Sequence, residues 1–472
     1  MLTYQDFIAE PESKRPEFIR KLIDQHNNSE LVKTARIADL YDQQRNVTIN
    51  EYVQKLYTAS GIAVENYVAS NNKIASNFFR RLNTQRNTYL LGNGITFTGD
   101  ENGQTKARMG EKFDTNMKRA GYYALIHGLV FVFWNATQTH VFPVTEFAPL
   151  WDERNSTLRA GVRYWQLDAD KPLIAVLFEE DGYTKYSTQS SGKELIEAEP
   201  KRAYKQTIAQ APADLEPVVI GEENYSNLPI VPLWGSSLHQ STLIGMRQAI
   251  DSYDLVRSGF ANDLEDCAQI YWLLENYGGM NDADLAQFRD RLRLQHIAVA
   301  DTSDGGKVQG YTHEVPHQAR QTYLDSLRAG IYEDFGGLDV HTVAAGATND
   351  HIEAAYQPMD EQADDYEYQL IECIQQLLKL AGQAQVQPIF KRNRIANQRE
   401  MVEMLMLSAE YLDEETIVSK LPFISPDEIQ QILERRDAEM QSRLKRETAQ
   451  QEELMQAVPD ATEEDEGQGG EV

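Results

Sequence analysis

A long helical repeat of apolar side chains dominates the middle of the chain. Between residues 241 and 267 such side chains recur at steps of three and four positions, which is typical of one face of an α-helix. A helix of this length extends over about 40 Å. The repeat consists of Leu243, Met246, Ile250, Tyr253, Phe260, Leu264 and Cys267, whereas Asp251, Asp254, Asn262, Asp263 and Asp266 fall on other faces.

After this helix the period of the pattern changes. Residues 269–274 predict a strand, a short helix is expected through Phe288 and Leu292, and residues 297–300 and 308–315 are expected to be extended. Pro316 then opens a second helix at the first-turn position that proline favours. Its apolar positions are Ala319, Tyr323, Leu327, Ile331 and Phe335, and it is expected to end at Gly336-Gly337. The pattern therefore predicts two long helices joined by a small αβ unit.

The N-terminal half mixes helical and strand patterns. Helices are predicted over residues 29–43, 50–55, 71–91 and 113–127, and strands over 95–97, 129–134 and several short segments between 141 and 186. Residues 187–215 are polar and predict a peripheral loop region. Arg80, Arg81 and Arg86 form a basic face, for which ordinary solvated charge is favoured over contact with DNA. No nucleophile, carboxylate pair or metal-ligand partner is placed in the sequence to support His127 as a catalytic base, so a packed histidine is favoured.

The C-terminal half begins with a segment poor in core-forming residues. Glycine, small and β-branched residues fill positions 337–352 and disfavour a helix. A long helix is predicted over residues 353–381, where Pro358 is expected to cause a bend or a late start. A strand at 388–390 precedes a basic patch, Lys391, Arg392 and Arg394. Helices are expected over 397–411, 413–421 and from Ser425 onward, and an acidic tail follows.

Composition limits the classes of function. The chain has 472 residues and a net charge of −28, so it lacks the overall basic surface with which proteins grip phosphates. Its 2 cysteines lie in helical patterns and are expected to be reduced. We expect a soluble intracellular protein, because no apolar run approaches the roughly 20 residues of a membrane span and no signal-peptide core is present.

Sequence motifs for catalysis are missing. The chain contains no phosphate-binding Gly-x-x-x-x-Gly-Lys-Ser/Thr loop, no His-Glu-x-x-His, no Gly-x-Ser-x-Gly and no Cys-x-x-Cys. His341 and His351 do not have the spacing of a metal site. We therefore expect neither enzymatic activity nor a cofactor, although an unfamiliar catalytic site stays as a weak alternative.

Several short sequence motifs in a fixed order resemble one family. Residues 249–254, Ser258, residues 261–263 and Glu265-Asp266 resemble the stem-helix signature of portal proteins from tailed double-stranded-DNA bacteriophages, of the siphophage type. Residues 224–233 resemble the segment that leads into that helix. The family's wing motif is matched at Asn71, Asn72, Tyr89, Leu90 and Gly92. Each motif is weak alone, but their order over nearly the whole chain makes the resemblance specific.

The resemblance implies a mostly helical α+β fold that assembles into a ring of about twelve copies, closed by head-to-tail contacts. It implies a wing at 1–238, a first stem helix at 239–267, a clip at 268–315 and a second stem helix at 316–336. A tunnel loop at 337–352, a long kinked helix returning to the wing at 353–388, a crown at 389–447 and a disordered acidic tail at 448–472 complete the expected organisation.

The implied function is a channel at one capsid vertex through which genomic DNA is packaged and ejected. The implied partners are other copies of the chain, double-stranded DNA in transit without sequence specificity, the terminase large subunit, the major capsid and scaffold proteins and a head-tail adaptor, with no membrane. The implied location is the virion, after assembly in the host cytoplasm. A structural head protein or scaffold without a DNA channel is the main alternative.

The resemblance also assigns roles to residues. The channel-facing part of the tunnel loop is assigned to Val340, His341, Thr342, Val343, Ala344 and Ala345. Val340, Val343, Ala344 and Ala345 would present small apolar groups that offer phosphates no fixed charge partner; an ordinary surface loop is the alternative. Stem packing is assigned to Leu243, Met246, Ile250, Tyr253, Phe260 and Leu264, and aspartate at Ile250 or Phe260 is expected to leave soluble monomer without rings. The basic patch Lys391, Arg392 and Arg394 is expected to pair with a neighbouring subunit or, less favoured, with DNA.

Overall fold

The computed structural model describes most of the chain. The described residues are 2–57, 61–66, 69–100, 104–154, 157–189, 194–209, 218–266, 271–275, 282–283, 286, 307–311, 316–339, 349–394, 398–409, 411–421, 432–443 and 445–446. They belong to two compact units, Met1–Asp339 with Tyr356–Arg394, and Val340–Ala355 with Ile395–Val472. More of the described residues lie in helices than in strands, and both classes are mixed along the chain, as the sequence predicted.

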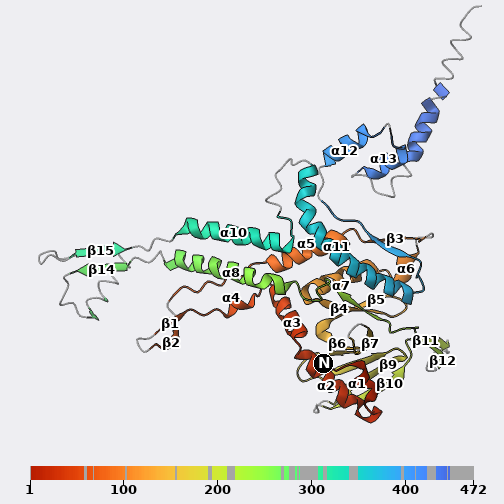
Figure 1. Ribbon diagram of the computed structural model, residues 1–472, viewed down its shortest axis with the longest axis horizontal. Helices are drawn as coiled ribbons and strands as arrows, with labels where there is room; N and C mark the ends of the chain where they lie inside the picture. The colour runs from red at the N-terminus through yellow and green to blue at the C-terminus, as the bar shows by residue number, and fades with distance from the viewer. Residues whose placement is uncertain are drawn as a thin grey trace, which may run out of the picture. The chain divides into compact units, whose positions relative to one another are not determined.

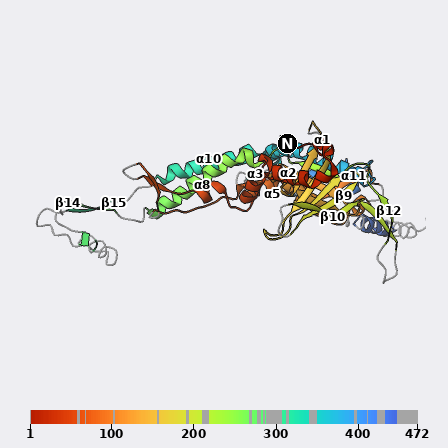
Figure 2. The same cartoon turned by 90° about the horizontal axis from the view of Figure 1, so that it is seen from below.

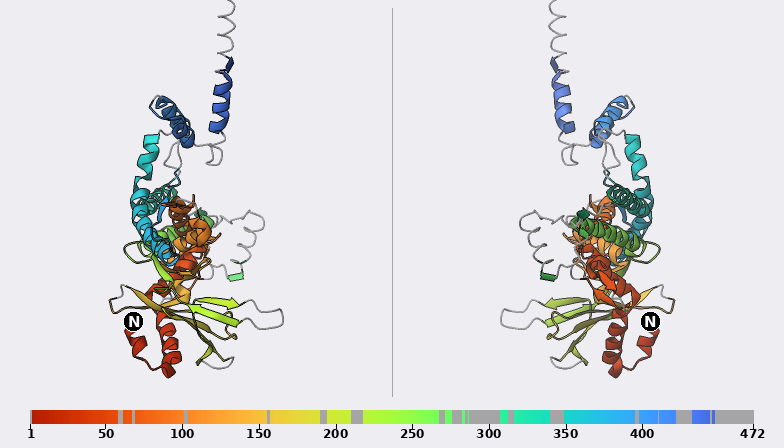
Figure 3. Two further views of the ribbon diagram at one scale, coloured as in Figure 1. Left: turned by 90° about the vertical axis from the view of Figure 1, so that its right-hand side faces the viewer. Right: turned by 90° about the vertical axis from the view of Figure 1, so that its left-hand side faces the viewer.

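An antiparallel sheet of five strands forms one end of the first unit. Its order is β10-β9-β8-β7-β6, made of Leu195–Arg202, Gly182–Thr188, Ile174–Glu179, Leu158–Trp165 and Phe147–Trp151. Helices α1 (Tyr4–Ala9) and α2 (Arg15–Asn27), separated by the short helix η1 (Glu12–Lys14), pack against this sheet (Figure 3). Phe7, Ile19 and Leu22 share a core with Val162 and Leu177, because the alternating strand residues present one apolar face.

A second layer of helices and strands follows along the chain. Strands β4 (Leu129–Trp134), β5 (Thr139–Pro143) and β13 (Ile230–Trp234) form a three-stranded sheet in the order β13-β4-β5, and η2 (Val144–Glu146) leads to β6. Against it lie α3 (Glu30–Asp42) and α7 (Phe113–His127), while α6 (Thr105–Met109) precedes α7. Ser29 caps α3 and Gly128 ends α7 in the left-handed region, so both predicted boundaries are confirmed.

Two polar segments depart from the prediction. Residues 187–215 are not simply a loop region, because β10 pairs with β9 and β11 (Lys205–Ala209) pairs with β12 (Val218–Glu223). Most β10 side chains are exposed, so this edge strand lacks the alternation that marks a half-buried strand. The predicted helix at 50–55 is also shifted: α4 spans Val47–Glu51 and Lys55 begins β1 (Lys55–Tyr57), which pairs with β2 (Ala63–Glu65).

The two predicted long helices lie side by side. Helix α8 spans Leu243–Asp266 and α10 spans His317–Phe335 (Figures 1 and 2). Between them in sequence, β14 (Tyr271–Glu275) pairs antiparallel with β15 (Lys307–Tyr311). The strands predicted at 269–274 and 308–315 are thus confirmed where the structure describes them. The predicted short helix through Phe288 and Leu292 and the strand at 297–300 lie outside the described residues.

Helix α11 (Asn349–Leu380) is the longest helix among the described residues. It begins before Pro358 and continues through it, so of the two predicted alternatives, a bend or a late start, the late start is excluded; the proline removes one N–H from the helical ladder without ending it. Gly382, at φ 74°, follows the helix as predicted. Strand β16 (Gln387–Phe390) then pairs with β3 (Ile95–Thr98). The second unit contains α12 (Gln398–Leu407), α13 (Glu414–Lys420) and helical residues 432–443.

The helix predicted over residues 71–91 is shorter than expected. Helix α5 spans only Phe78–Leu91, and residues 71–77 have no regular secondary structure. The prediction was wrong for these seven residues, because side chains of α8 accept hydrogen bonds from the backbone N–H groups of Asn72, Ile74 and Ser76.

Among the described residues, no helix is both long enough and apolar enough to cross a membrane.

Candidate functional site

The buried face of α8 changes chemistry halfway along the helix. Six residues spaced by three or four positions are at most 6% exposed, and they form one continuous face: Leu243, Met246, Ile250, Asp254, Ser258 and Asn262. The first three belong to an apolar core shared with α3, α5 and α10. The last three are polar. A helix face that is buried over its whole length therefore packs against apolar side chains in one half and against polar groups in the other.

The polar half of this face binds the backbone of an extended segment. We call residues 71–77, which run beside α8, the strap. Within the strap, Ser76 N donates to Asp254 Oδ1 over 2.9 Å and Ile74 N donates to Ser258 Oγ over 3.0 Å. Asn72 N donates to Oδ1 of Asn262, the last of the three polar residues on the buried face, over 2.6 Å. Alternate residues of the strap are thus held by successive turns of the helix.

Geometry explains why a helix can hold an extended chain in this way. Two residues of an extended chain advance by roughly 6.6 Å, and four residues of an α-helix advance by about 6.0 Å. The two repeats nearly match over three contacts, so the N–H groups of Asn72, Ile74 and Ser76 meet acceptors on successive turns of α8. For these three groups the helix supplies the hydrogen bonds that a neighbouring β-strand would otherwise provide.

Asp254 is the innermost acceptor. Its carboxylate is fully buried and also accepts from Asn46 Nδ2, next to the N-terminus of α4. Burial raises the pKa of Asp254, although the hydrogen bonds from Ser76 and Asn46 oppose that change by favouring the charged form. Asp251, one turn earlier, accepts from Thr48 Oγ1 over 2.7 Å and from the Tyr41 hydroxyl. These carboxylates join α8 to α3 and α4.

Helices α8 and α10 run antiparallel and touch at both ends. Arg320, near the start of α10, forms an ion pair with Asp263, near the end of α8, and lies 5.9 Å from the Phe260 ring centroid. At the other end the Phe78 ring lies between Tyr253 and Tyr332, at centroid distances of 5.0 and 6.1 Å in edge-to-face geometry. Such aromatic pairs add about 0.5–1.5 kcal/mol beyond area burial.

The residues predicted to pack the stem have two different environments. Leu243, Met246 and Ile250 are buried within the chain's own core, and Tyr253 is partly buried against it. Phe260 is half-buried, and Leu264 is 54% exposed. On α10, Tyr323 is 51% exposed and Leu324 is buried instead. Of the residues predicted to pack the stem, Phe260 and Leu264, in the half of α8 that leads to β14, are therefore the ones left accessible to a neighbouring copy.

The end of α10 is held by α5. The Arg86 guanidinium donates to the carbonyl oxygen of Phe335, the last residue of α10, over 2.5 Å and stacks on the Phe335 ring at 3.9 Å. A cation at this position complements the negative end of the helix dipole. Burial lowers the pKa of Arg86 to about 10. The predicted solvated basic face is therefore wrong at Arg86, which is 6% exposed.

The backbone that follows α10 is also fixed. Gln85 Nε2 donates to Leu338 O over 3.0 Å, and Leu338 N donates to Gln85 Oε1 over 3.1 Å. Arg328 forms an ion pair with Asp339 over 2.8 Å. Gly336 ends α10 at φ 66°, as predicted, and a Cβ there would lie 2.8 Å from Pro358 O. Side chains from α5, α10 and α11 thus determine the path of residues 336–339.

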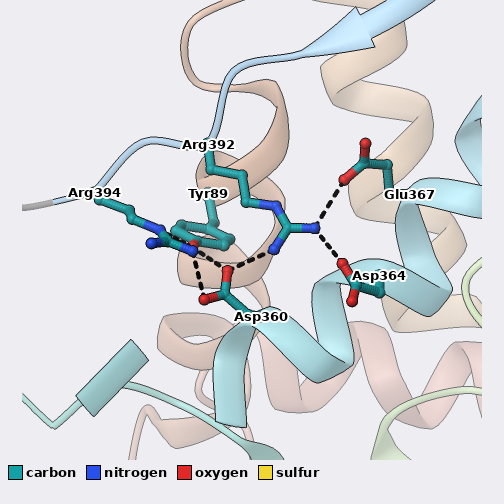
Figure 4. Close-up of polar contacts among 6 residues, drawn as sticks. All are labelled: Tyr89, Asp360, Asp364, Glu367, Arg392 and Arg394. Atoms are coloured by element: carbon teal, nitrogen blue, oxygen red, sulfur yellow. Dashed lines mark hydrogen bonds and ion pairs between the residues drawn. The ribbon is translucent and has the colours of Figure 1, made fainter. Parts of the chain in front are cut away.

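The basic patch after β16 has partners within its own chain. Arg392 pairs with Asp360 over 2.6 Å, with Glu367 over 3.2 Å and with Asp364, all on α11 (Figure 4). Arg394 pairs with Asp360 over 2.5 Å. The sequence analysis had proposed a neighbouring subunit or DNA as the partner of these charges. In the structure, Arg392 and Arg394 instead belong to an intrachain network. Of the three basic residues, Lys391 alone is exposed without a recorded ion pair among the described residues.

Two other sequence predictions concern ionisable side chains. His127 is 1% exposed and its Nε2 lies 2.7 Å from Asp39 Oδ1, which agrees with a packed histidine. Cys373 is buried and reduced, and burial raises its pKa, whereas Cys267 lies outside the described residues. No cluster of three or more metal-ligating side chains occurs in the part of the chain that the structure describes.

Comparison with known proteins identifies the family. The model for "Phage portal protein, SPP1 Gp6-like" matches residues 20–442. The chain belongs to this portal protein family. It is 24% identical to the portal protein of Bacillus phage SPP1 over 498 aligned positions, which cover 98% of this chain and 95% of that protein. It is also 26% identical to the portal protein of Clostridium phage phiCD119 over 211 residues, which cover 43% of this chain and less than half, 47%, of that relative.

Family membership gives the stem-helix signature a physical meaning. Asp254, Ser258 and Asn262 belonged to the sequence motif that resembled portal proteins, and they are the residues that hold the strap. Sequence reasoning identified the motif but placed Asp254 and Asn262 away from the apolar face. Gln85 and Arg86 were missed as functional residues, since nothing in the sequence marks a contact 250 positions away. The predicted tunnel-loop residues Val340 to Ala345 lie outside the described residues.

Proposed function

We propose that this portal protein assembles into the ring-shaped channel at one capsid vertex, through which genomic DNA is packaged and later ejected. In this proposal the wing, stem, clip, crown and acidic tail occupy the boundaries predicted from the sequence. The ring docks the terminase large subunit and the head-tail adaptor, and contacts the major capsid and scaffold proteins. The chain acts without a cofactor, and the energy for DNA movement comes from a separate ATPase.

The observation that supports this proposal most directly is the family match over residues 20–442. The stem adds physical support. Helices α8 and α10 pack on each other, and Leu264 and Tyr323 on them are more than half exposed. Large apolar side chains on a protruding helix pair favour burial against another protein surface. Neighbouring copies arranged around an axis would supply that surface.

The channel wall is proposed to be a surface that does not hold DNA. The chain carries a net charge of −28, and every copy in a ring adds the same charge, so electrostatics oppose stable binding of phosphates. Residues 340–345 are proposed to line the channel, with small apolar side chains at Val340, Val343, Ala344 and Ala345. Weak, sequence-independent contact suits a polymer that has to move in both directions.

Ring formation is tested by imaging purified full-length protein by negative-stain electron microscopy and by native mass spectrometry. We expect a closed ring of about twelve copies with a central hole. A monomeric globule or an open filament at micromolar concentration contradicts the proposal and favours a structural head protein without a channel.

The tunnel loop is tested by deletion of residues 340–347. The deletion is expected to leave the ring mass unchanged and to reduce DNA packaging into proheads, because residues 336–339 are held independently by α5, α10 and α11. Wild-type packaging by rings of the deletion variant removes the channel role of these residues.

A further inference from the structure

A groove lies where α8 begins and α10 ends. It has a volume of about 350 Å³ and is open to the surface of the first unit. Its apolar floor includes Met246, Ala249 and Ile331. Leu238, which also lines it, is 72% exposed, and Ile244, next to the lining residue Gly245, is 54% exposed. The groove is thus a partly apolar depression with exposed aliphatic side chains in and beside it.

The rim of the groove is acidic. Asp334 from α10 and Glu361 and Asp365 from α11 line it. Asp365 accepts from the backbone N–H of Ser237 over 3.0 Å, whereas Asp334 and Glu361 are exposed and have no recorded ion pair among the described residues. Arg86 also lines the groove, but it is buried and its guanidinium donates to the Phe335 carbonyl. The accessible charge is therefore negative.

A basic corner lies at the junction of α3, α4 and α5. Arg45 is exposed in the turn after α3, and the Arg80 side chain is 57% exposed near the start of α5. The recorded ion pair of Arg80, with Asp42, is long at 3.9 Å, and exposed pairs of this kind contribute little. The corner therefore carries positive charge that the chain itself neutralises only weakly.

The groove and the basic corner lie at the same level of α8. The groove floor uses Met246 and Ala249. The corner is tied to the next turn of the helix, because Tyr41 and Thr48, which flank Arg45 in sequence, both donate to Asp251. Rotation about a ring axis preserves height along that axis. In a ring whose channel runs along the stem helices, only surfaces at one level can meet between neighbours.

We propose that the acidic groove receives the basic corner, Arg45 and Arg80, of the next copy of this chain. The surfaces differ, so the contact is heterologous and repeats from copy to copy until the ring closes. Attraction between the acidic rim and the two arginines determines how neighbouring copies align, and the apolar residues in and beside the groove supply the buried area. This inference rests on the proposed ring function, since it assigns the surfaces through which that ring forms.

Charge exchange tests the contact. The acidic-side variant carries Asp334→Arg and Glu361→Arg, the basic-side variant carries Arg45→Glu and Arg80→Glu, and the third variant combines all four changes. Native mass spectrometry measures the fraction of chains in rings at a fixed concentration. Each two-residue variant is expected to lower this fraction at least about tenfold, because like charges then meet, and the four-residue variant is expected to regain most of it.

A matched control is Glu333→Arg, which reverses an exposed carboxylate beside Asp334 that does not line the groove. Its rings should form normally, and circular dichroism should show that every variant is folded. The inference is overturned if the two-residue variants form rings as well as the wild type does. It is also overturned if the four-residue variant is folded but its fraction of chains in rings is no higher than that of the two-residue variants. If the wild-type protein forms no ring, the proposed function fails instead, whatever the charge variants do.

Discussion

Asp254 is fully buried although it carries a carboxylate. Two oxygens accept from Ser76 N and Asn46 Nδ2, so the cost of removing the group from water is offset by directed hydrogen bonds. Ser258 and Asn262 repeat this arrangement one and two turns further along α8. At the scale of single residues, the distal half of α8 is therefore a row of acceptors for one extended segment, and each acceptor has its own donor.

The first prediction concerns this row. Asp254→Asn presents an amide N–H₂ where one of the two donors now meets an oxygen, so one buried donor loses its partner. We expect the free energy of unfolding to fall by about 1–3 kcal/mol, and the amides of Ile74 and Ser76 to exchange faster with deuterium. Asp325→Asn, on the exposed face of α10, should change the stability by less than about 0.5 kcal/mol. If both substitutions change the free energy of unfolding equally, the buried acceptors of α8 contribute nothing specific to stability.

The second prediction follows from Asp360. Burial acts to raise its pKa, but hydrogen bonds from Tyr89, Arg394 and Arg392 outweigh burial and lower the pKa below the ordinary aspartate value. A lowered folded-state pKa contributes stability that is present above the unfolded-state pKa, near 3.9, and is lost as the pH falls through the folded-state pKa. The stability difference between wild type and Asp360→Asn should therefore shrink as the pH falls from about 5 to about 3, in urea titrations. A difference that is constant over this range contradicts the assignment.

At the scale of elements, glycines show where the backbone is constrained. Gly336 ends α10 in the left-handed region, and an added Cβ would lie 2.8 Å from Pro358 O on α11. Gly259 lies inside α8, and an added Cβ there would meet nothing within 4 Å. The two glycines therefore have opposite roles: one is required by a turn and a close approach, and the other only lowers the helix propensity.

The third prediction compares them. Gly259→Ala should raise the free energy of unfolding by about 0.5–1 kcal/mol, because alanine is favoured in a helix interior. Gly336→Ala should lower it by at least about 1 kcal/mol, because a left-handed conformation and a short contact are both imposed on the new side chain. Chemical denaturation of the two variants under one buffer condition measures both values. Stabilisation by both changes would show that the turn after α10 adapts freely.

At the scale of the whole molecule, burial within one chain separates two kinds of stem residue. Ile250 is inaccessible in the core that joins α8 to α3, α5 and α10, whereas Leu264 is 54% exposed. The sequence analysis assigned both residues to packing of the stem between subunits. Aspartate at Ile250 buries an unpaired charge inside the monomer, so the expectation of a soluble monomer from that change is revised.

The fourth prediction uses this distinction. Ile250→Asp should prevent folding or lower the stability by more than about 4 kcal/mol, as seen in soluble yield and circular dichroism. Leu264→Asp should give a folded chain whose stability differs from wild type by less than about 1 kcal/mol, with fewer rings in native mass spectrometry. Folded Ile250→Asp monomers would restore the original expectation, and normal rings from Leu264→Asp would place the subunit contact elsewhere.

Periodicity predicted most of the regular structure. Helices α3, α7, α8 and α10 and the strand before Lys391 were found close to their expected bounds, because long apolar repeats and glycine stops are local signals. The helix predicted from Asn71 was wrong at its start, since the donors of the strap bind acceptors almost 200 residues away. Strands β10 and β11 were missed, because edge strands with polar side chains depend on backbone pairing rather than on alternation.

The amino-acid sequence by itself determined the two long helices, the strands β14 and β15 between them and membership of the portal family. Each of these depends on the order of residues along the chain. Only the tertiary structure decided that Asp254, Ser258 and Asn262 are buried, that Arg86 ends α10, and that Arg392 and Arg394 pair with α11. The physical reason is that the free energy of a polar or charged side chain depends on its partners in space, which periodicity along the chain does not specify.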